Sequence, residues 1–251
     1  MDSSDEMKKL QYFLLGMDML LFLIVVGKAA RDGVSALSSG KIEKQDISVM
    51  QTVKSTEQLE LSLQDQTDKK VALTFDDGPN AEYTEELLAG LRERGVKATF
   101  FLLGEEAEKH PEIVEDIYND GHLIGNHSYE HVNLGQLSDA AAIEQVDKTN
   151  ATIQKITGEY PQYIRPPFGS WKCNLDYETT MIEVLWDVDP RDWATDNAAA
   201  VTQSVVSKVR EDDIILLHDA SESSVQAAFA IVDELQKQGY VFVTVEEILF
   251  D

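Results

Sequence analysis

Two adjacent carboxylates at the end of an apolar segment are the residues in this chain most able to support chemistry. Asp76 and Asp77 follow the β-rich run 71–75 and precede Gly78-Pro79, a pair that forces a turn. This pattern places both carboxylates at the carboxyl end of a strand, the edge where α/β folds build their sites. Two neighbouring buried carboxylates repel each other, so the pair requires a compensating cation. A solvated loop is the alternative for this segment taken alone.

Two histidines four residues apart could supply further ligands for such a cation. One helical turn would aim the imidazoles of His127 and His131 at one point. With one carboxylate of the Asp76-Asp77 pair, they form the two-nitrogen, one-oxygen set of a catalytic divalent metal. An isolated histidine pair of this spacing is more often accidental, but the combination favours a ligand set. We expect His110 to open a polar helix and His122 to pack or hydrogen-bond locally.

Three more segments place polar groups after predicted strands. The two prolines of segment 165–169 fix a loop that can aim a backbone N–H at a ligand, although a plain turn fits equally well. Segment 189–193 combines an acidic turn with an aromatic residue, which suits sugar binding but also occurs often by chance. His218 ends the apolar run 214–217, where a titratable group is costly unless it is used or paired. His218 is therefore a candidate for acid–base chemistry.

The elements that must position these residues alternate between strand-like and helix-like segments. The predicted strands are 71–75, 98–103, 122–126, 163–165, 182–186, 214–217 and 241–245. The predicted helices are 83–94, 105–119, 138–157, 198–209 and 224–237. About seven β/α units of this kind predict a parallel sheet, either doubly wound or closed as a barrel. Either arrangement brings the polar residues together at the carboxyl ends of the strands.

The five motifs, in this order, resemble those of the polysaccharide deacetylase family, the NodB-homology domain of carbohydrate esterase family 4. They occupy residues 74–79, 127–131, 165–169, 189–193 and 216–218. The resemblance covers residues 69–251, and it implies a distorted (β/α) barrel of about seven parallel strands, similar to a TIM barrel. It also implies one bound divalent metal held by Asp77, His127 and His131. Zinc is the expected ion, with cobalt, nickel or manganese as alternatives.

The resemblance also implies roles for the residues around the metal. Asp76 is the expected general base toward the attacking water, and Arg165 is the residue expected to orient it. His218 is the expected general acid for the departing amine. Asp189 is expected to orient and charge His218.

Three further residues are expected to contact the substrate. The backbone N–H of Phe168 would hold the oxyanion together with the metal. Trp193 and Leu216 would line the pocket for the acetyl group.

These roles imply a hydrolase that removes N-acetyl groups from N-acetylglucosamine residues of a cell-envelope polysaccharide, with peptidoglycan the favoured substrate. A chitin-oligosaccharide deacetylase or an acetylxylan esterase would use the same site. A catalytically inactive sugar-binding module has no need for a complete set of acid, base and metal ligands. A membrane-tethered structural protein would explain the N-terminus but none of the motifs.

The N-terminal residues form a separate unit. Residues 1–27 contain the apolar run 10–26, and on insertion scales its apolar residues balance or exceed the cost of Asp18. We expect a single membrane anchor, a stalk over residues 28–68, and an extracytoplasmic catalytic domain over residues 69–251. A signal peptide cleaved after residues 27–29, giving a secreted enzyme, is the alternative.

Composition excludes several other classes of protein and site. The 251-residue chain has a net charge of −25, which argues against nucleic acid as a partner because a binder must neutralise phosphates with Lys and Arg. We attribute this acidity to solubility rather than to a specific cationic partner. The single cysteine, Cys173, excludes an intrachain disulfide and a cysteine-rich metal site. The sequence indicates no obligate protein partner.

Overall fold

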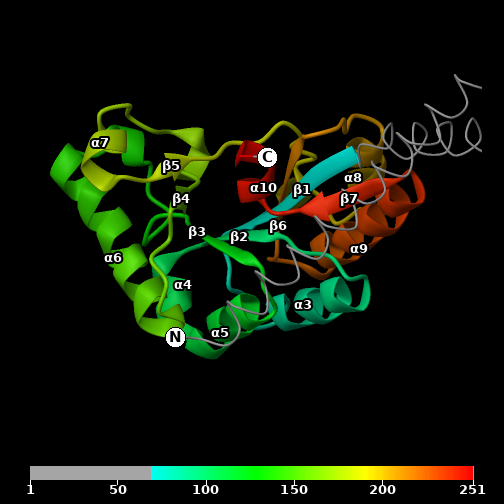
Figure 1. Ribbon diagram of the computed structural model, residues 1–251, viewed down its shortest axis with the longest axis horizontal. Coiled ribbons are helices and arrows are strands. Elements are labelled where there is room, and N and C mark those ends of the chain that lie inside the picture. Colours follow the sequence, from blue (N-terminus) through cyan, green and yellow to red (C-terminus); the bar gives the residue numbers. More distant parts are fainter. Residues whose placement is uncertain (1–68, 251) are drawn as a thin grey trace, which may run out of the picture. The chain divides into compact units, whose positions relative to one another are not determined.

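Seven parallel strands form the sheet of the computed structural model, which describes residues 69–250 (Figure 1). The strands are β1 (Lys69–Asp76), β2 (Thr99–Leu102), β3 (Leu123–Asn126), β4 (Tyr163–Ile164), β5 (Ile182–Glu183), β6 (Ile214–His218) and β7 (Tyr240–Val243). Their spatial order is β5-β4-β3-β2-β1-β6, and β7 also pairs with β1. The predicted α/β fold with a parallel sheet is therefore confirmed.

The sheet has the form of a half-barrel rather than a regular closed barrel. β5 contains two residues and pairs with β4 on one side. The chain after β5 then approaches β6 through an isolated parallel bridge between Val188 and Ile215. This irregular connection is the distortion that the sequence could anticipate only through its resemblance to a family of distorted barrels.

Eight helices and three short 3-10 helices accompany the strands within the described residues, and the last helix, α10, follows the last strand. The helices are α3 (Thr84–Glu93), α4 (Gly104–Lys109), α5 (Pro111–Asn119), α6 (Asp139–Thr157), α7 (Leu175–Thr179), α8 (Ala198–Val206), α9 (Glu222–Lys237) and α10 (Val245–Phe250). The 3-10 helices are η1 (Leu134–Gln136), η2 (Pro167–Gly169) and η3 (Asp192–Ala194). The predicted ends of α6 are confirmed: the Ser138 side chain accepts from Ala141 N, and Gly158 ends the helix with φ 81°.

Three predicted elements differ from the structure. Segment 105–119 forms two helices, because Pro111 disfavours a helical conformation of His110 and lacks an N–H group. The predicted strand 182–186 ends after Glu183, since Arg165 takes the carbonyl groups of the two following residues as hydrogen-bond acceptors. The predicted strand 241–245 ends at Val243, and a short helix, α10, follows it.

The alternation of side chains along β1 separates two cores and points polar groups toward one face. Val71, Leu73 and Phe75 belong to the large apolar cluster that the sheet forms with α3, α5 and α9. Ala72 faces the opposite side, in a second cluster with residues from β2, β4, β6 and α10. Asp76 lies four residues after Ala72 in β1, so its side chain is on this second face. The interior of the half-barrel therefore becomes polar at the carboxyl ends of its strands.

No helix within residues 69–250 is long and apolar enough to cross a membrane. The predicted anchor at residues 10–26 and the predicted stalk lie outside the described residues.

His122 packs and hydrogen-bonds locally, as the sequence predicts. It is buried just before β3, where its Nδ1 atom accepts a hydrogen bond from Ala98 N at 3.1 Å. Its ring meets the ring of Phe100 edge to face. Burial, with a further contribution from Lys97, lowers the pKa of His122 to about 4. The imidazole is therefore neutral in the folded protein at neutral pH.

Acid should consequently destabilise the fold through His122. The unfolded histidine titrates near pKa 6.5, so below that pH the unfolded chain binds a proton that the folded protein excludes until about pH 4. The free energy of unfolding therefore has its full contribution from neutral His122 above pH 6.5. It loses roughly 3 kcal/mol of that contribution as the pH falls from 6.5 through about 4. Urea unfolding should show a smaller acid-induced loss of stability in His122→Gln than in the wild type. Equal losses in the two proteins would contradict this assignment.

Candidate active site

The loops after β1, β3, β4 and β5 carry most of the predicted site residues, and their backbones are unusual. Seven residues other than glycine have positive φ in the described chain, and five of them lie in these four loops. Such conformations are costly for residues with a Cβ atom and cluster at functional sites. The five residues are Asp77, Ser128, His131, Phe168 and Arg191.

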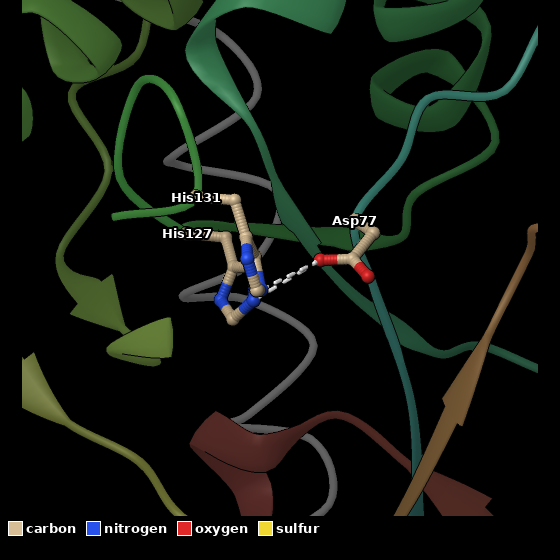
Figure 2. Close-up of side chains that lie close together, drawn as sticks. All are labelled: Asp77, His127 and His131. Carbon is tan, nitrogen blue, oxygen red and sulfur yellow. Dashed lines mark ion pairs between the residues drawn. The ribbon is translucent and has the colours of Figure 1, made fainter. Parts of the chain in front are cut away.

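Asp77, His127 and His131 converge in space, as the metal prediction requires (Figure 2). The Nε2 atoms of both histidines lie 3.3 Å from Asp77 Oδ1. Ligand atoms of a tetrahedral zinc ion, each about 2.0–2.2 Å from the metal, are separated by about 3.4 Å. Asp77 Oδ1 is also buried without a hydrogen-bond partner in the described residues. The three side chains therefore fit a divalent metal.

The protonation states of these residues also suit metal binding. His127 Nδ1 lies 2.6 Å from the carbonyl oxygen of Arg165, so Nδ1–H donates there and Nε2 presents its lone pair to the cluster. Burial lowers the pKa of His131, which favours the neutral ligand form. Burial alone would raise the pKa of Asp77, but the neighbouring histidines, His127 first among them, lower it. The ring orientation of His127 and the lowered pKa values of His131 and Asp77 therefore suit metal binding.

A loop, not the predicted helical turn, brings the two histidines together. Residues 127–131 contain no helix, and positive φ values at Ser128 and His131 reverse the chain. Asn126 Oδ1 accepts from Ser128 N at 2.7 Å. The N–H groups of the next two residues both donate to Gln145 Oε1 on α6. Sequence reasoning missed Asn126 and Gln145, whose roles depend on contacts between distant segments.

Asp76 lies beside this cluster and is held by Arg165. Both residues are buried, and Arg165 Nη1 donates to Asp76 Oδ1 at 2.8 Å. The guanidinium is itself fixed by Thr74 Oγ1 and by two backbone carbonyl groups. Asp76 Oδ2 lies 3.9 Å from His127 Nε2, on the side of the metal ligands. The contact expected between Asp76 and Arg165 is therefore present, and their roles in the reaction stay predictions.

The carboxylate paired with His218 is Asp192, which corrects the prediction of Asp189. His218 Nδ1 lies 2.9 Å from Asp192 Oδ1, and His218 N donates to Asp192 Oδ2 at 2.9 Å. Asp189 Oδ1 instead accepts from Arg191 N, closing a local turn. An aspartate followed by proline is a common start of such turns, so the sequence held a signal for this role.

The environment of His218 favours its charged form. Burial opposes the charge, but the hydrogen bond and charge of Asp192, together with Asp76 and Asp77, raise the pKa to about 9. Because Nδ1–H donates to Asp192, the protonated ring presents Nε2–H elsewhere. His218 Nε2 lies 4.0 Å from Asp77 Oδ2, beside the metal ligands. A charged imidazole and a buried carboxylate therefore lie beside the three converging side chains.

The three residues predicted to contact substrate differ in exposure. Phe168 and Trp193 are 68% and 60% exposed, and large aromatic surfaces of this kind suit stacking on sugar rings. The Phe168 ring meets that of His131 edge to face, so it borders the group formed by Asp77, His127 and His131. Leu216 is buried in β6, on the same face of the strand as His218. The roles of all three residues in substrate binding stay predictions.

Comparisons with known proteins agree with this geometry. A model of the polysaccharide deacetylase family matches residues 63–184. Peptidoglycan-N-acetylmuramic acid deacetylase PdaC of Bacillus subtilis is 38% identical over 73% of this chain and 39% of its own length. A peptidoglycan-N-acetylglucosamine deacetylase of Bacillus cereus is 35% identical over 72% of this chain and 89% of its own length. The solved structure of PdaC has a TM-score of 0.71, with 38% identity, and covers 74% of this chain and 92% of that one.

The chain spans only part of other curated relatives. It covers 66% of a second Bacillus cereus peptidoglycan-N-acetylglucosamine deacetylase, at 41% identity. The similarity to PdaC likewise concerns one part of a longer protein.

Proposed function

Because this chain belongs to the polysaccharide deacetylase family, we propose that it is a metal-dependent N-deacetylase of a cell-envelope polysaccharide, with N-acetylglucosamine residues of peptidoglycan as its substrate. Relatives named as peptidoglycan deacetylases support this substrate class. The observation that carries the proposal is that three converging side chains able to hold a metal have a buried carboxylate, Asp76, and an imidazole paired with a carboxylate, His218, beside them.

Asp77, His127 and His131 would hold the divalent ion, for which we propose zinc. When bound, such an ion polarises a carbonyl group and makes water acidic enough to react near neutral pH. The chain itself supplies the remaining proton transfers.

In this proposal, Asp76 accepts a proton from the attacking water. Asp76 Oδ1 accepts a hydrogen bond from Arg165, whereas Oδ2 faces His127. Oδ2 would therefore be the atom that accepts the proton. The hydrogen bond also fixes the orientation of the carboxylate, so no reorientation is needed during the reaction.

In this proposal, His218 donates a proton to the departing nitrogen. An amine anion is a very poor leaving group, so amide hydrolysis requires protonation of the nitrogen as the C–N bond breaks. With Nδ1–H directed to Asp192, the transferable proton is the one on Nε2. The products are acetate and a free amino sugar, and the acid favours an N-acetyl over an O-acetyl substrate.

The test is mass spectrometry of acetate loss by the purified full-length chain. Peptidoglycan fragments, chitin oligomers and acetylxylan would be compared at equal concentrations of acetyl groups. We expect a mass loss of one acetyl group per reacting N-acetylglucosamine, with peptidoglycan fragments reacting fastest. Faster reaction of acetylxylan would favour the O-acetyl esterase instead. If none of the three substrates loses acetate, the proposal that this chain is a deacetylase is wrong.

We propose also that residues 10–26 anchor the protein in the cell membrane with its catalytic domain outside the cytoplasm. The apolar composition of this run supports the proposal. The full-length protein should then sediment with membranes and resist extraction by salt and alkali. A mature N-terminus near Ala30, found by N-terminal sequencing, would show cleavage and secretion instead.

A further inference from the structure

Asp219 is a buried carboxylate that the proposed reaction does not use. It directly follows His218 at the end of β6 and is 1% exposed. Its Oδ1 atom has no hydrogen-bond partner within the described residues. Burying a carboxylate oxygen without a hydrogen bond destabilises the folded state, and such groups in native proteins often have a functional role.

The strand register brings Asp219 against the turn that carries Asp77. β1 and β6 run parallel with Asp76 opposite His218, so Asp77 and Asp219 continue from neighbouring strand ends. The Asp219 carboxylate packs directly on Gly78: a Cβ atom at Gly78 would lie 2.5 Å from Oδ2 and 2.9 Å from Oδ1. This close approach excludes a side chain at position 78 unless Asp219 moves.

Thr84 provides the second contact between Asp219 and this turn. Thr84 is fully buried, and its Oγ1 donates to Asp219 Oδ2 while accepting from Asn80 N at 2.7 Å. Thr84 is also the first residue of α3. Asp219 therefore touches both ends of the connection between β1 and α3, at Gly78 and at Thr84.

We propose that Asp219 is a positioning residue of the metal centre. By fixing the connection between β1 and α3, it holds Asp77 Oδ1 where that atom meets His127 and His131. Asp77 has φ 73°, a conformation that persists only when surrounding contacts restrain it. This inference rests on the proposed metal-dependent function. Mutation of a residue that orients a metal ligand typically weakens metal affinity about 10–100-fold.

The test measures zinc affinity by competition with a chelator, which requires no substrate. Asp219→Ala removes both contacts with the turn, and Thr84→Val removes the hydroxyl at nearly constant volume. We expect both variants to raise the Kd for zinc about 10–100-fold. Asp219→Asn keeps the volume and can still accept from Thr84, so its Kd should change less. Thr179→Val is the matched control, because Thr179 is a buried threonine whose hydroxyl donates to Leu175 O within α7.

A second measurement separates positioning from general destabilisation. The visible absorption of the cobalt-loaded protein reports the geometry of the metal ligands, so it should shift in Asp219→Ala and not in Thr179→Val. Unchanged zinc affinity and an unchanged cobalt spectrum in folded Asp219→Ala and Thr84→Val would overturn the proposal. If Asp219→Ala fails to fold, the same two measurements are made on Thr84→Val, and an unchanged Kd for zinc with an unchanged cobalt spectrum in that variant would overturn the proposal. A wild type that binds zinc but releases no acetate would refute the deacetylase and leave this comparison intact.

Discussion

Replacing either His127 or His131 by alanine should abolish both metal binding and deacetylation. Each histidine supplies one of three convergent ligand atoms, and loss of one leaves a two-ligand set that cannot hold the ion firmly. Chelation of the wild type should likewise reduce acetate release to background, and added zinc or cobalt should restore it. Metal analysis of the purified variants and acetate release from peptidoglycan fragments measure the two effects. Full activity of a chelated, metal-free preparation would exclude this mechanism.

The adjacent aspartates provide an internal control for this prediction. Asp77→Asn removes a charged ligand and should weaken metal binding. Asp76→Asn should retain the metal, because Asp76 is not one of the three side chains whose ligand atoms converge. Its turnover should nevertheless fall about 10²–10⁴-fold, the usual contribution of a general base. Equal metal loss in both variants would show that the two roles are misassigned.

Local sequence signals predicted much of what positions the site. Apolar runs that end in Gly, Pro or charged residues identified all seven strands, and Ser138 and Gly158 identified both ends of α6. Because parallel strands gather their carboxyl ends, the strand assignments alone placed the polar loops that follow them at one edge of the sheet. The short helices α7 and α10 were missed, since five or six residues carry too little periodicity to be recognised.

The residues that sequence reasoning missed depend on contacts across the fold. Asp192 and Asp189 are both acidic residues near one tryptophan, and only the position of β6 decides which of them meets His218. Asp219 reaches the turn after β1 through strand register, with Thr84 lying 135 positions away in the chain. Such pairings cannot be obtained from composition or spacing. They follow only once the order of strands in the sheet is known.

The pairing of His218 with Asp192 leads to the second large expected effect. His218→Ala should leave the fold and the metal content intact but reduce amide hydrolysis about 10²–10⁴-fold, since it removes the leaving-group acid. Hydrolysis of an activated aryl acetate should suffer much less, because its leaving group departs without a proton. Asp192→Asn should weaken amide hydrolysis in the same direction, whereas Asp189→Asn is the matched control and should have little effect. A loss as large in Asp189→Asn as in Asp192→Asn would contradict the observed pairing.

The pH profile of amide hydrolysis tests the charge state of the same histidine. His218 acts when protonated, so activity should fall as the pH rises through its pKa, which the surrounding carboxylates raise to about 9. A divalent cation in the site would repel the imidazolium charge, which places this alkaline limb at or below pH 9. Asp192→Asn removes the principal stabilising charge and should move the limb to lower pH, which pH–rate measurements of kcat/KM would record. If the limb stays in place in Asp192→Asn, His218 is not the group whose deprotonation ends the reaction.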